Sequence, residues 1–306
     1  MKIYTDIASV PKAERGISIG VFDGVHRGHH ALLRQLLAES RRNGWRAMVL
    51  TFANHPQEIL NPPPPLLLTT VEERMQRLRE LGIDEALLLP FTEALSHYSA
   101  ERFCREVLVE ALGCRLLVAG ADFALGHRRE GTISRLQELG RQLGFQVVVA
   151  PTVCHERQPI SSSHIRQLLL NGQIERANEL LSAPFRLTGT VVAGAGRGKA
   201  LGFPTINLQI PSGKLLPHHG IYAGKAHLPE GVWDAAVYIG VRPSFNEATP
   251  VVEAHLLDFE GTISYGTSVT VELLAFVRED RRFESIDALV EQMRADVTTV
   301  RERLRG

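Results

Sequence analysis

The spacing of the apolar residues changes near residue 184, and this change constrains the fold more than any other feature of the chain. Before it, short apolar runs alternate with segments whose apolar residues recur at helical spacing. After it, the runs are β-branched or alternate with polar residues, and Gly and Pro clusters separate them. The first pattern is typical of strands and helices around a parallel sheet, and the second of antiparallel strands. We therefore predict an α/β domain at residues 1–184 and an antiparallel β domain at residues 185–306.

The individual elements follow from the same patterns. In the first domain, apolar runs predict strands at 17–22, 48–52, 86–89, 116–119 and 147–150. Helical spacing predicts helices over 29–43 and 72–81, each followed by a glycine that ends it. In the second domain we expect strands at 187–192, 221–227, 235–239, 251–257 and 267–276, which close into a small barrel, and a long final helix over 286–304 capped by Ser285. The prolines at 62–65 predict a stiff surface loop, with docking of a PxxP-binding partner as the alternative.

The charge balance and the cysteines argue against several classes of function. The chain of 306 residues carries 34 Lys and Arg against 34 Asp and Glu, whereas nucleic-acid binders usually have a basic excess. Its three cysteines form no CxxC motif, which is typical of a reducing compartment. We see no signal-peptide pattern, and no apolar run reaches the roughly 18–20 residues that span a bilayer. We expect a cytoplasmic protein that binds small molecules and needs no nucleic acid, membrane or obligate protein partner.

A glycine-rich turn with two histidines lies between the first predicted strand and helix, at residues 20–29 (GVFDGVHRGH). In a parallel sheet this junction is the carboxyl end of a strand, where ligands bind, and the N–H groups at a helix start suit a phosphate. Glycine lets the backbone approach the ligand, and His26 and His29 can donate hydrogen bonds to phosphate oxygens as their charge grows. We therefore predict a phosphate site. The alternatives are a plain turn and a zinc site, which would lack a third ligand nearby.

A second candidate phosphate motif occupies residues 160–166 (ISSSHIR), where serine hydroxyls begin a helix and Arg166 follows one turn later. Backbone N–H groups, hydroxyls and a guanidinium together can clamp the β- and γ-phosphates that leave as pyrophosphate. The alternative is an ordinary serine cap with an arginine on the surface.

In the second domain, a glycine-rich segment with two cations (residues 194–199, GAGRGK) precedes the sequence LGFPTINL at 201–208. Such a loop suits ATP phosphates, although it lacks the ending of a Walker A motif. Thr205 and Asn207 point to the same side of an extended chain, and their oxygens can hold Mg²⁺ beside the phosphates. Glu253 is a candidate base, inside the barrel, for an alcohol that attacks the γ-phosphate. The alternatives are a plain hairpin and a solvated strand residue.

These motifs resemble those of one enzyme family. The form GxFDGxHxGH is similar to the signature of the HxGH nucleotidyltransferase superfamily as bacterial bifunctional riboflavin kinase/FAD synthetases carry it, and GRGxxLGFPTxN is similar to the riboflavin kinase signature. Further matching segments lie at 51–56, 68–73, 89–92, 120–123, 160–166, 220–224, 243–246, 253–259 and 278–283. The resemblance covers residues 16–304. Pro159 stands where the family often has a basic residue, and Ile206 where alanine is commoner.

The resemblance implies a Rossmann-like nucleotidyltransferase domain and a riboflavin kinase barrel, which phosphorylate riboflavin to FMN and adenylylate FMN to FAD with ATP and Mg²⁺. The FMN phosphate would attack the α-phosphorus of ATP in line, without a covalent enzyme intermediate. For adenylyl transfer, the implied residues are the catalytic His26 and His29 and, for ATP, Gly20, Phe22, Asp23, Gly28, Asp122, Ser161, Ser162 and Arg166. For the kinase they are the catalytic base Glu253, Gly196, Arg197, Gly198 and Lys199 for ATP, Thr205 and Asn207 for the metal, and Asn246, Arg278 and Phe283 for the flavin.

Three other functions stay open. An adenylyltransferase whose barrel only binds flavin would be favoured by loss of Thr205, Asn207 or Glu253, and this chain has all three. A flavin or nucleotide sensor would bind these ligands without turnover. An HxGH enzyme with another phosphate substrate would have no evident use for the attached barrel.

Overall fold

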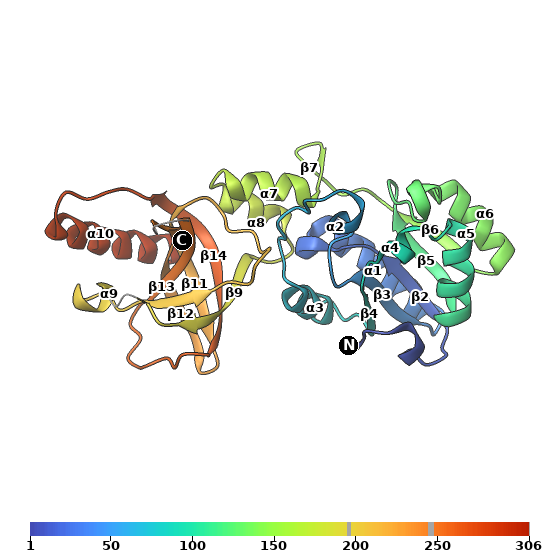
Figure 1. Cartoon of the computed structure of the whole chain (residues 1–306), viewed down its shortest axis with the longest axis horizontal. Coiled ribbons are helices and arrows are strands. Elements are labelled where there is room, and N and C mark those ends of the chain that lie inside the picture. Colours follow the sequence, from blue (N-terminus) through green and yellow to red (C-terminus); the bar gives the residue numbers. More distant parts are fainter. Residues whose placement is uncertain (195–196, 244–247, 306) are drawn as a thin grey trace. The chain divides into compact units, whose positions relative to one another are not determined.

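The computed structural model describes residues 1–194, 197–243 and 248–305. The chain forms two compact units, Met1–Ser161 and Ser162–Gly306 (Figure 1). The helices α7 (Ser162–Leu170) and α8 (Ile174–Leu180) fall in the second unit, ahead of the boundary predicted at 184. The apolar spacing shows where the parallel-sheet pattern ends, but it does not show which core the intervening helices join. Residue 184 as a functional boundary stays a prediction.

The first unit is built on a parallel six-stranded sheet, and every residue of this unit is described. The strands lie in the order β1-β4-β3-β2-β5-β6, and all pairs are parallel. They are β1 (Lys2–Tyr4), β2 (Arg15–Ile19), β3 (Arg46–Phe52), β4 (Glu85–Leu89), β5 (Cys114–Gly120) and β6 (Gln146–Ala150). From β2 the chain adds β3 and β4 on one side and then β5 and β6 on the other. In open α/β sheets, ligands bind at the carboxyl ends of the strands where this order reverses, here between β2 and β5.

Helices cover both faces of this sheet (Figure 1). The apolar side chains of α1 (Arg27–Arg42) and α3 (Val71–Glu80) form one buried cluster with strand residues such as Val49 and Val118. The π-helical segment η3 (Phe103–Ala111) and α6 (Ile133–Leu143) form a second cluster with residues such as Leu50 and Leu117. Short elements complete the unit: η1 (Ile7–Ser9), η2 (Asp23–Val25), α2 (Gln57–Leu60), α4 (Glu93–Ser96), α5 (Ala100–Arg102), η4 (His127–Arg129), β7 (Cys154–His155) and β8 (Gln158–Pro159).

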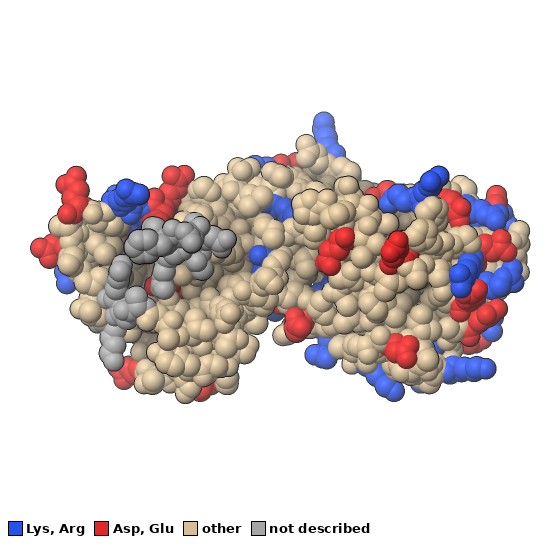
Figure 2. Space-filling view, viewed as in Figure 1, with Lys and Arg blue, Asp and Glu red and all other residues tan. Residues whose placement is uncertain are grey.

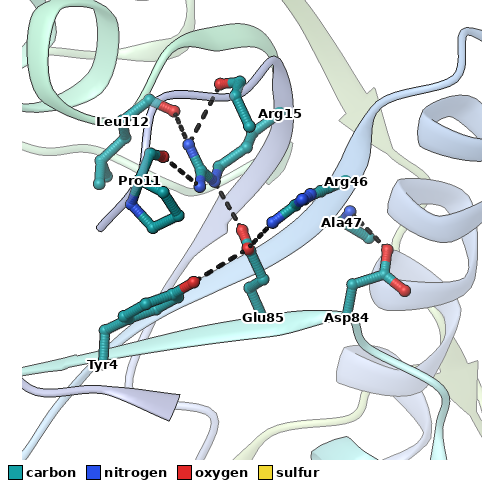
Figure 3. Close-up of polar contacts among 9 residues, drawn as sticks. Tyr4, Pro11, Arg15, Arg46, Ala47, Asp84, Glu85 and Leu112 are labelled. Atoms are coloured by element: carbon teal, nitrogen blue, oxygen red, sulfur yellow. Dashed lines mark hydrogen bonds and ion pairs between the residues drawn. The ribbon is translucent and has the colours of Figure 1, made fainter. Parts of the chain in front are cut away.

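An ionic network, buried at Arg15 and Glu85 and exposed at Arg46, ties together the amino ends of β2, β3 and β4 (Figure 3). Glu85 accepts hydrogen bonds from Arg15 at 2.6 Å, from Arg46 at 2.7 Å and from the hydroxyl of Tyr4 at 3.2 Å. Arg15 is fully buried, and its remaining N–H groups donate to the carbonyls of Pro11, Ala13 and Leu112. Burial would raise the pKa of Glu85, but Arg15 and Arg46 outweigh it and hold that pKa below its ordinary value. The charges of Arg15, Arg46 and Glu85 therefore compensate one another. They lie at the amino ends of the strands, whereas folds of this kind bind ligands at the carboxyl ends.

The second unit contains a closed antiparallel barrel in the order β10-β13-β12-β11-β14-β9. Its strands are β9 (Phe185–Val192), β10 (Ile206–Gln209), β11 (Gly220–Leu228), β12 (Gly231–Pro243), β13 (Ala248–Leu256) and β14 (Ser268–Glu279). A short helix, α9 (Arg197–Ala200), lies between β9 and β10. The long helix α10 (Ile286–Arg305) packs on the outside of the barrel, where Val300 is buried against Ala223 and Ala275.

Hydrogen bonds join α7 and α8 to the barrel and to the segment before β11. The side chain of Asn178 donates to the carbonyl of Leu273 and accepts from the amide of Phe185, both at 2.8 Å. Glu175 accepts from the amide of Phe276 at 3.2 Å, and the carbonyl of Leu169 accepts from the amide of His218 at 2.9 Å. The two helices therefore belong with the barrel rather than forming a loose connection.

The fold confirms the predicted parallel sheet, the closed barrel and the final helix. The cap on α10 is also confirmed, because the hydroxyl of Ser285 accepts from the amide of Ala288 at 3.1 Å. The strands β1 and β10 were not predicted, since runs of three and four residues are too short to show a period. The strand predicted at 17–22 extends too far, because β2 ends at Ile19 and Phe22 adopts a left-handed conformation.

Candidate active sites

The turn after β2 carries backbone strain at the carboxyl edge of the parallel sheet. Phe22, Gly24 and Val25 have φ of 52°, 80° and 40°, a region that residues with a side chain rarely adopt. Phe22 and Val25 are nevertheless buried. Such strain persists only where the surroundings hold the backbone, and it clusters at binding sites. Phe22 is part of the predicted phosphate turn. Its ring meets that of His29 edge to face, with centroids 5.2 Å apart.

Asp23 holds this turn to the segment that precedes α3. One carboxylate oxygen accepts from the amide and the hydroxyl of Thr69, at 3.0 and 3.2 Å, and the other accepts from the amide of Leu68 at 3.0 Å. The hydroxyl of Thr69 in turn accepts from the amide of Gly24 at 3.0 Å. The structure thus gives Asp23 the task of fixing the turn, while its direct contact with ATP stays a prediction.

Arg74 on α3 is a site residue that the sequence reasoning missed. Its guanidinium donates to the carbonyl of Val21 at 2.6 Å and to that of Phe52 at 2.5 Å, so it joins the chain leaving β2 to the end of β3. Burial, the largest cause, lowers the pKa of Arg74 to about 10, which leaves it charged at neutral pH. A buried positive charge therefore stands beside the turn. In the sequence, an arginine on an amphipathic helix looks like a surface residue, so the residues around Arg74 give no signal of this role.

His26 and His29 stack at the start of α1, with ring centroids 3.6 Å apart. Nδ1 of His26 accepts from the amide of His29 at 3.3 Å and so caps the helix. Burial lowers the pKa of His26 to about 4, against the opposing effect of the Asp23 carboxylate. Burial, followed by the neighbouring His26, lowers the pKa of His29 well below its ordinary value. Both rings are therefore neutral at pH 7, and the proton of His26 is on Nε2, where it can be donated.

The Nδ1 atom of His29 is buried and has no hydrogen-bond partner among the residues that the structure describes. A buried polar atom without a partner costs about 1–3 kcal/mol, which a phosphate oxygen accepting from Nδ1–H would offset. Gly28 permits the stacked arrangement, because a Cβ there would lie 3.1 Å from the ring of His26. The two rings are thus placed so that both could donate, while donation by His26 and His29 to a phosphate stays a prediction. Within the described residues, no group of three or more His, Cys, Asp or Glu side chains is placed to hold a metal ion, so the zinc alternative gains no support.

The strand β5 brings a second turn to the same edge of the sheet. The amide of Phe123 donates to the carbonyl of Gly120 at 3.1 Å, and a Cβ on Gly120 would lie 3.3 Å from Oδ1 of Asp122. Gly20, which leaves β2, and Asp122, which leaves β5, therefore flank the point where the strand order reverses. Ser161 ends the first unit, whereas Ser162 and Arg166 lie on α7 in the second. That these three residues join the site stays a prediction.

In the second unit, the predicted metal residues meet the predicted base. The hydroxyl of Thr205 donates to a carboxylate oxygen of Glu253 at 3.4 Å, and Asn207 on β10 lies directly opposite Glu253 on β13. Hydroxyl, amide and carboxylate oxygens are ligands that Mg²⁺ accepts, and it usually takes only one or two protein ligands beside substrate phosphates. The donor set therefore fits the metal that accompanies ATP.

The glycine-rich segment closes on these residues. A Cβ on Gly194 would lie 2.1 Å from the amide nitrogen of Asn207, and one on Gly198 would lie 3.1 Å from the hydroxyl of Thr205. The backbone thus approaches both predicted metal residues as only glycine allows. Gly196, predicted to bind ATP, lies outside the described residues, and Arg197 and Lys199 are placed only as backbone positions of α9.

The location predicted for Glu253 inside the barrel is wrong. Along β13, the buried residues are Val252, Ala254 and Leu256, which form the face toward the interior. Side chains alternate along a strand, so Glu253 and His255 lie on the outer face, where the segment before β10 partly covers them. The candidate site is therefore on the outside of the barrel wall.

Of the predicted flavin residues, Arg278 lies near the end of β14 and Phe283 lies in the segment that follows this strand. Arg278 makes a two-pronged ion pair with Asp296 of α10, at 2.8 and 2.7 Å, and its guanidinium lies 5.8 Å from the centre of the Phe283 ring. Asp296 is 5% exposed, and sequence reasoning missed it because it stands among polar residues of an exposed helix. Asn246, the third predicted flavin residue, lies outside the described residues.

Comparisons with known proteins agree with this division. Residues 10–164 match the family model described as FAD synthetase, and residues 181–304 match the one described as riboflavin kinase. The bifunctional riboflavin kinase/FMN adenylyltransferase of Escherichia coli (strain K12) is 34% identical over 299 residues, which cover 97% of this chain and 95% of that protein. The protein of the same name from Bacillus subtilis (strain 168) is 32% identical over 291 residues, which cover 93% and 91%.

A solved structure shares the whole fold. It belongs to a protein of Streptococcus pneumoniae described as a macrolide-efflux protein, and it aligns with a TM-score of 0.89 and 29% identity over 98% of both chains. In the described part of the present chain, no helix is both long enough and apolar enough to cross a membrane. Acidic and basic side chains are interspersed on the face of the first unit that Figure 2 shows, in keeping with the equal numbers of the two signs.

The fold, the two sites and the matched families define a class of enzyme that builds flavin cofactors in two steps. The chain belongs to the bifunctional riboflavin kinase/FMN adenylyltransferase family. Accordingly, it phosphorylates riboflavin to FMN and adenylylates FMN to FAD.

Proposed function

We propose that the two reactions are divided between the sites described above, with phosphorylation at the outer face of the barrel and adenylylation at the carboxyl edge of the parallel sheet. One observation carries this assignment: Thr205 and Asn207 meet Glu253 of a later strand, and the backbone approaches Asn207 at Gly194 and Thr205 at Gly198. Such a grouping serves no evident purpose in a barrel that only binds flavin.

In the kinase reaction, Glu253 takes the proton from the 5′-hydroxyl of riboflavin as the hydroxyl oxygen attacks the γ-phosphorus of ATP, and the bond from that phosphorus to the bridging oxygen breaks to release ADP. Thr205 and Asn207 hold Mg²⁺, which when bound neutralises charge on the phosphates. The hydroxyl of Thr205 donates its hydrogen to one carboxylate oxygen of Glu253, so its lone pairs are directed elsewhere. Arg278 and Phe283 contribute to flavin binding, and the backbone around Gly198 and α9 lies against the phosphates.

In the adenylylation reaction, a phosphate oxygen of FMN attacks the α-phosphorus of ATP, and pyrophosphate leaves. His26 and His29 donate hydrogen bonds as neutral rings to the oxygens whose charge grows. Ser161, Ser162 and Arg166 hold the leaving phosphates. Little covalent work falls to the protein, so the strained turn held by Asp23 and Arg74 contributes by fixing the geometry.

A reciprocal pair of substitutions tests the division. Glu253→Gln keeps size and hydrogen bonding but removes the base, so FMN formation should fall by about 10²–10⁴-fold while conversion of supplied FMN to FAD is unchanged. His29→Ala removes a donor, so FAD formation should fall by about 10²–10³-fold while FMN accumulates from riboflavin. Both products are quantified chromatographically. If either substitution lowered both reactions equally in a folded protein, the assignment would be wrong.

The metal and the cellular setting belong to the same proposal. Both reactions use ATP, so excess EDTA should abolish FMN and FAD formation, and added Mg²⁺ should restore both. Full kinase activity in EDTA would remove the role given to Thr205 and Asn207. We also propose that the enzyme works in the cytoplasm on free riboflavin, FMN and ATP, without an obligate protein partner.

A further inference from the structure

Two side chains of β13 hold the segment that leads into β10. Glu253 accepts from the hydroxyl of Thr205 at 3.4 Å, and His255, on the same face, contacts the carbonyl oxygen of Pro204 through Nδ1 at 2.8 Å. A carbonyl oxygen can only accept a hydrogen bond, so Nδ1 of His255 carries a proton and donates it. The neighbouring residues Pro204 and Thr205 are therefore each held by a side chain of the same strand.

Backbone pairing starts only after this segment. The register of β10 with β13 begins with Ile206 opposite Ala254, and Pro204 has no N–H with which to extend it. The carbonyl of Pro204 and the amide of Thr205 belong to one planar peptide group. A hydrogen bond that fixes this carbonyl therefore fixes the peptide plane from which the Thr205 side chain projects. His255 supplies the bond that the strand ladder does not.

The imidazole of His255 has a second contact with the same segment. The ring of Phe203 meets it edge to face, with centroids 5.5 Å apart. On the other side, a Cβ on Gly198 would lie 2.4 Å from the carbonyl oxygen of Phe203, so the backbone of the glycine-rich segment packs directly on it. The residues Phe203 to Thr205 thus lie between the side chain of His255 and the backbone at Gly198.

We propose that His255 is a positioning residue of the kinase site: through Nδ1–H it holds the carbonyl of Pro204, so that the Thr205 hydroxyl is aimed at Glu253 and at the metal-bound ATP. This inference rests on the kinase site proposed above. His255 acts through the backbone and does not touch the reacting atoms. Since a displacement of about 1 Å at a reacting centre can cost about 10²-fold, we expect its loss to cost about 10- to 100-fold in kcat/KM.

Three substitutions at this one position separate the hydrogen bond from the bulk of the ring. His255→Asn places an amide N–H near the position of Nδ1, His255→Gln places one near Nε2, and His255→Ala places none. Riboflavin phosphorylation should fall by about 10- to 100-fold with Ala and Gln, and Asn should recover most of the activity. Equal losses in all three variants, or wild-type activity in all three, would overturn the proposal. Thermal unfolding and FMN adenylylation are measured for each variant, and only folded proteins are compared.

Binding supplies a readout that does not depend on turnover. Calorimetric titration with MgADP should show about tenfold weaker binding for His255→Ala than for wild type, with recovery in His255→Asn. Unchanged MgADP binding in His255→Ala would contradict the proposed effect on Thr205. Glu253→Gln, assayed alongside, separates the two hypotheses. If it lowers phosphorylation and His255→Ala does not, only the role of His255 is wrong. If Glu253→Gln leaves phosphorylation intact, the proposed kinase site itself is wrong.

Discussion

The two candidate sites are built in opposite ways. In the first unit, the site forms where parallel strands end, and a strained turn is held by buried side chains that bond to backbone, namely Asp23 and Arg74. In the second unit, the site lies on the outer face of a barrel strand, and glycines let the backbone close on half-buried polar residues. The parallel sheet gathers its site by topology, because its strands all end at one edge. The strands of an antiparallel barrel do not all end on one side. The site of the second unit therefore depends on how closely the glycine-rich segment packs on Thr205 and Asn207.

This difference predicts where each unit is sensitive. The first site should depend on charged residues that are buried and hydrogen bonded, whose loss affects stability and pH response. The second should depend on steric fit at glycines, whose substitution affects activity with little change in stability.

A large effect on stability should come from removing α7 and α8, the helices that are hydrogen bonded to the barrel. We predict that residues 185–306, expressed alone, fold and phosphorylate riboflavin, but that residues 162–306 are more stable. The four hydrogen bonds of Leu169, Glu175 and Asn178 to the barrel and to the segment before β11 contribute roughly 1 kcal/mol each, so the difference should be about 4 kcal/mol. Urea unfolding of the two fragments measures it. Equal stability would show that α7 and α8 do not belong with the barrel, and a folded 185–306 fragment without FMN production would contradict an autonomous kinase.

A change at the amino edge of the sheet should affect stability alone. Glu85→Gln leaves the fully buried Arg15 without its counter-charge, and breaking such a buried pair costs about 3–5 kcal/mol. We expect this loss in the free energy of unfolding of the first unit, measured by urea denaturation. FAD formation by the folded fraction should keep its kcat, because the proposed adenylylation site lies at the opposite edge of the sheet.

The control for this substitution is Glu39→Gln, which breaks an ion pair to Arg42, a side chain that is 72% exposed. Exposed pairs contribute about 0–1 kcal/mol, so the control should change little. If both substitutions lowered the free energy of unfolding by similar amounts, burial of the Arg15–Glu85 pair would not explain its contribution to stability.

Acid should destabilise the first unit through its histidines. The pKa of His26 is about 4 in the folded state, against about 6.5 when unfolded, so its contribution to stability is complete above pH 6.5 and is lost as the pH falls toward 4. At pH 5, protonation of His26 in the unfolded state should lower the free energy of unfolding of the first unit by about 2 kcal/mol. His26→Asn keeps a cap for α1 but cannot titrate, so the loss of stability between pH 7 and pH 5 should be smaller by that amount. A variant that loses as much stability as wild type over this interval would refute the low pKa.

Much of the fold could be predicted from the sequence because the apolar spacing reports burial directly. The leucines of α1 and the β-branched runs of the sheet show which face is inside. The same rule corrects the prediction for Glu253. The apolar face of β13, with Val252 and Ala254, was visible in the sequence and indicates the interior, so the carboxylate had to face outward. The alternation along β13 is sufficient by itself to place this carboxylate on the outer face.

The rest could not be predicted, because it depends on contacts between distant residues. Nothing in the sequence around Arg74 indicates that it reaches two strand ends, and Asp296 looks like an ordinary polar residue of a surface helix. The motif residues His26 and Asp23 were found, but their roles as helix cap and as anchor of the turn required coordinates. Short motifs thus locate the sites, whereas the supporting residues appear only in the folded chain.

The smallest effect predicted here concerns steric fit at the barrel. Gly194→Ala would place a Cβ 2.1 Å from the amide nitrogen of Asn207, so the Asn207 side chain must move. Because that side chain is flexible, the protein should remain folded, with the amide displaced from the metal position. We expect riboflavin phosphorylation to fall about tenfold, equivalent to about 1.4 kcal/mol, and more Mg²⁺ to be needed for half-maximal rate. Conversion of FMN to FAD in the same protein should be unchanged.

A double-mutant cycle shows whether Gly194 acts through Asn207. If it does, Gly194→Ala should cost little further activity in a protein that already carries Asn207→Ala, because the displaced group is gone. Gly213→Ala serves as the control, since Gly213 has a φ of 81° but nothing within 4 Å of an added Cβ. It should lower the unfolding temperature without changing the kinase rate. A full tenfold loss from Gly194→Ala in the Asn207→Ala background would mean that Gly194 acts on the ATP phosphates or the loop backbone. It would then contradict the proposal that the kinase site, unlike the hydrogen-bonded turn of the first unit, depends on the steric fit between Gly194 and Asn207.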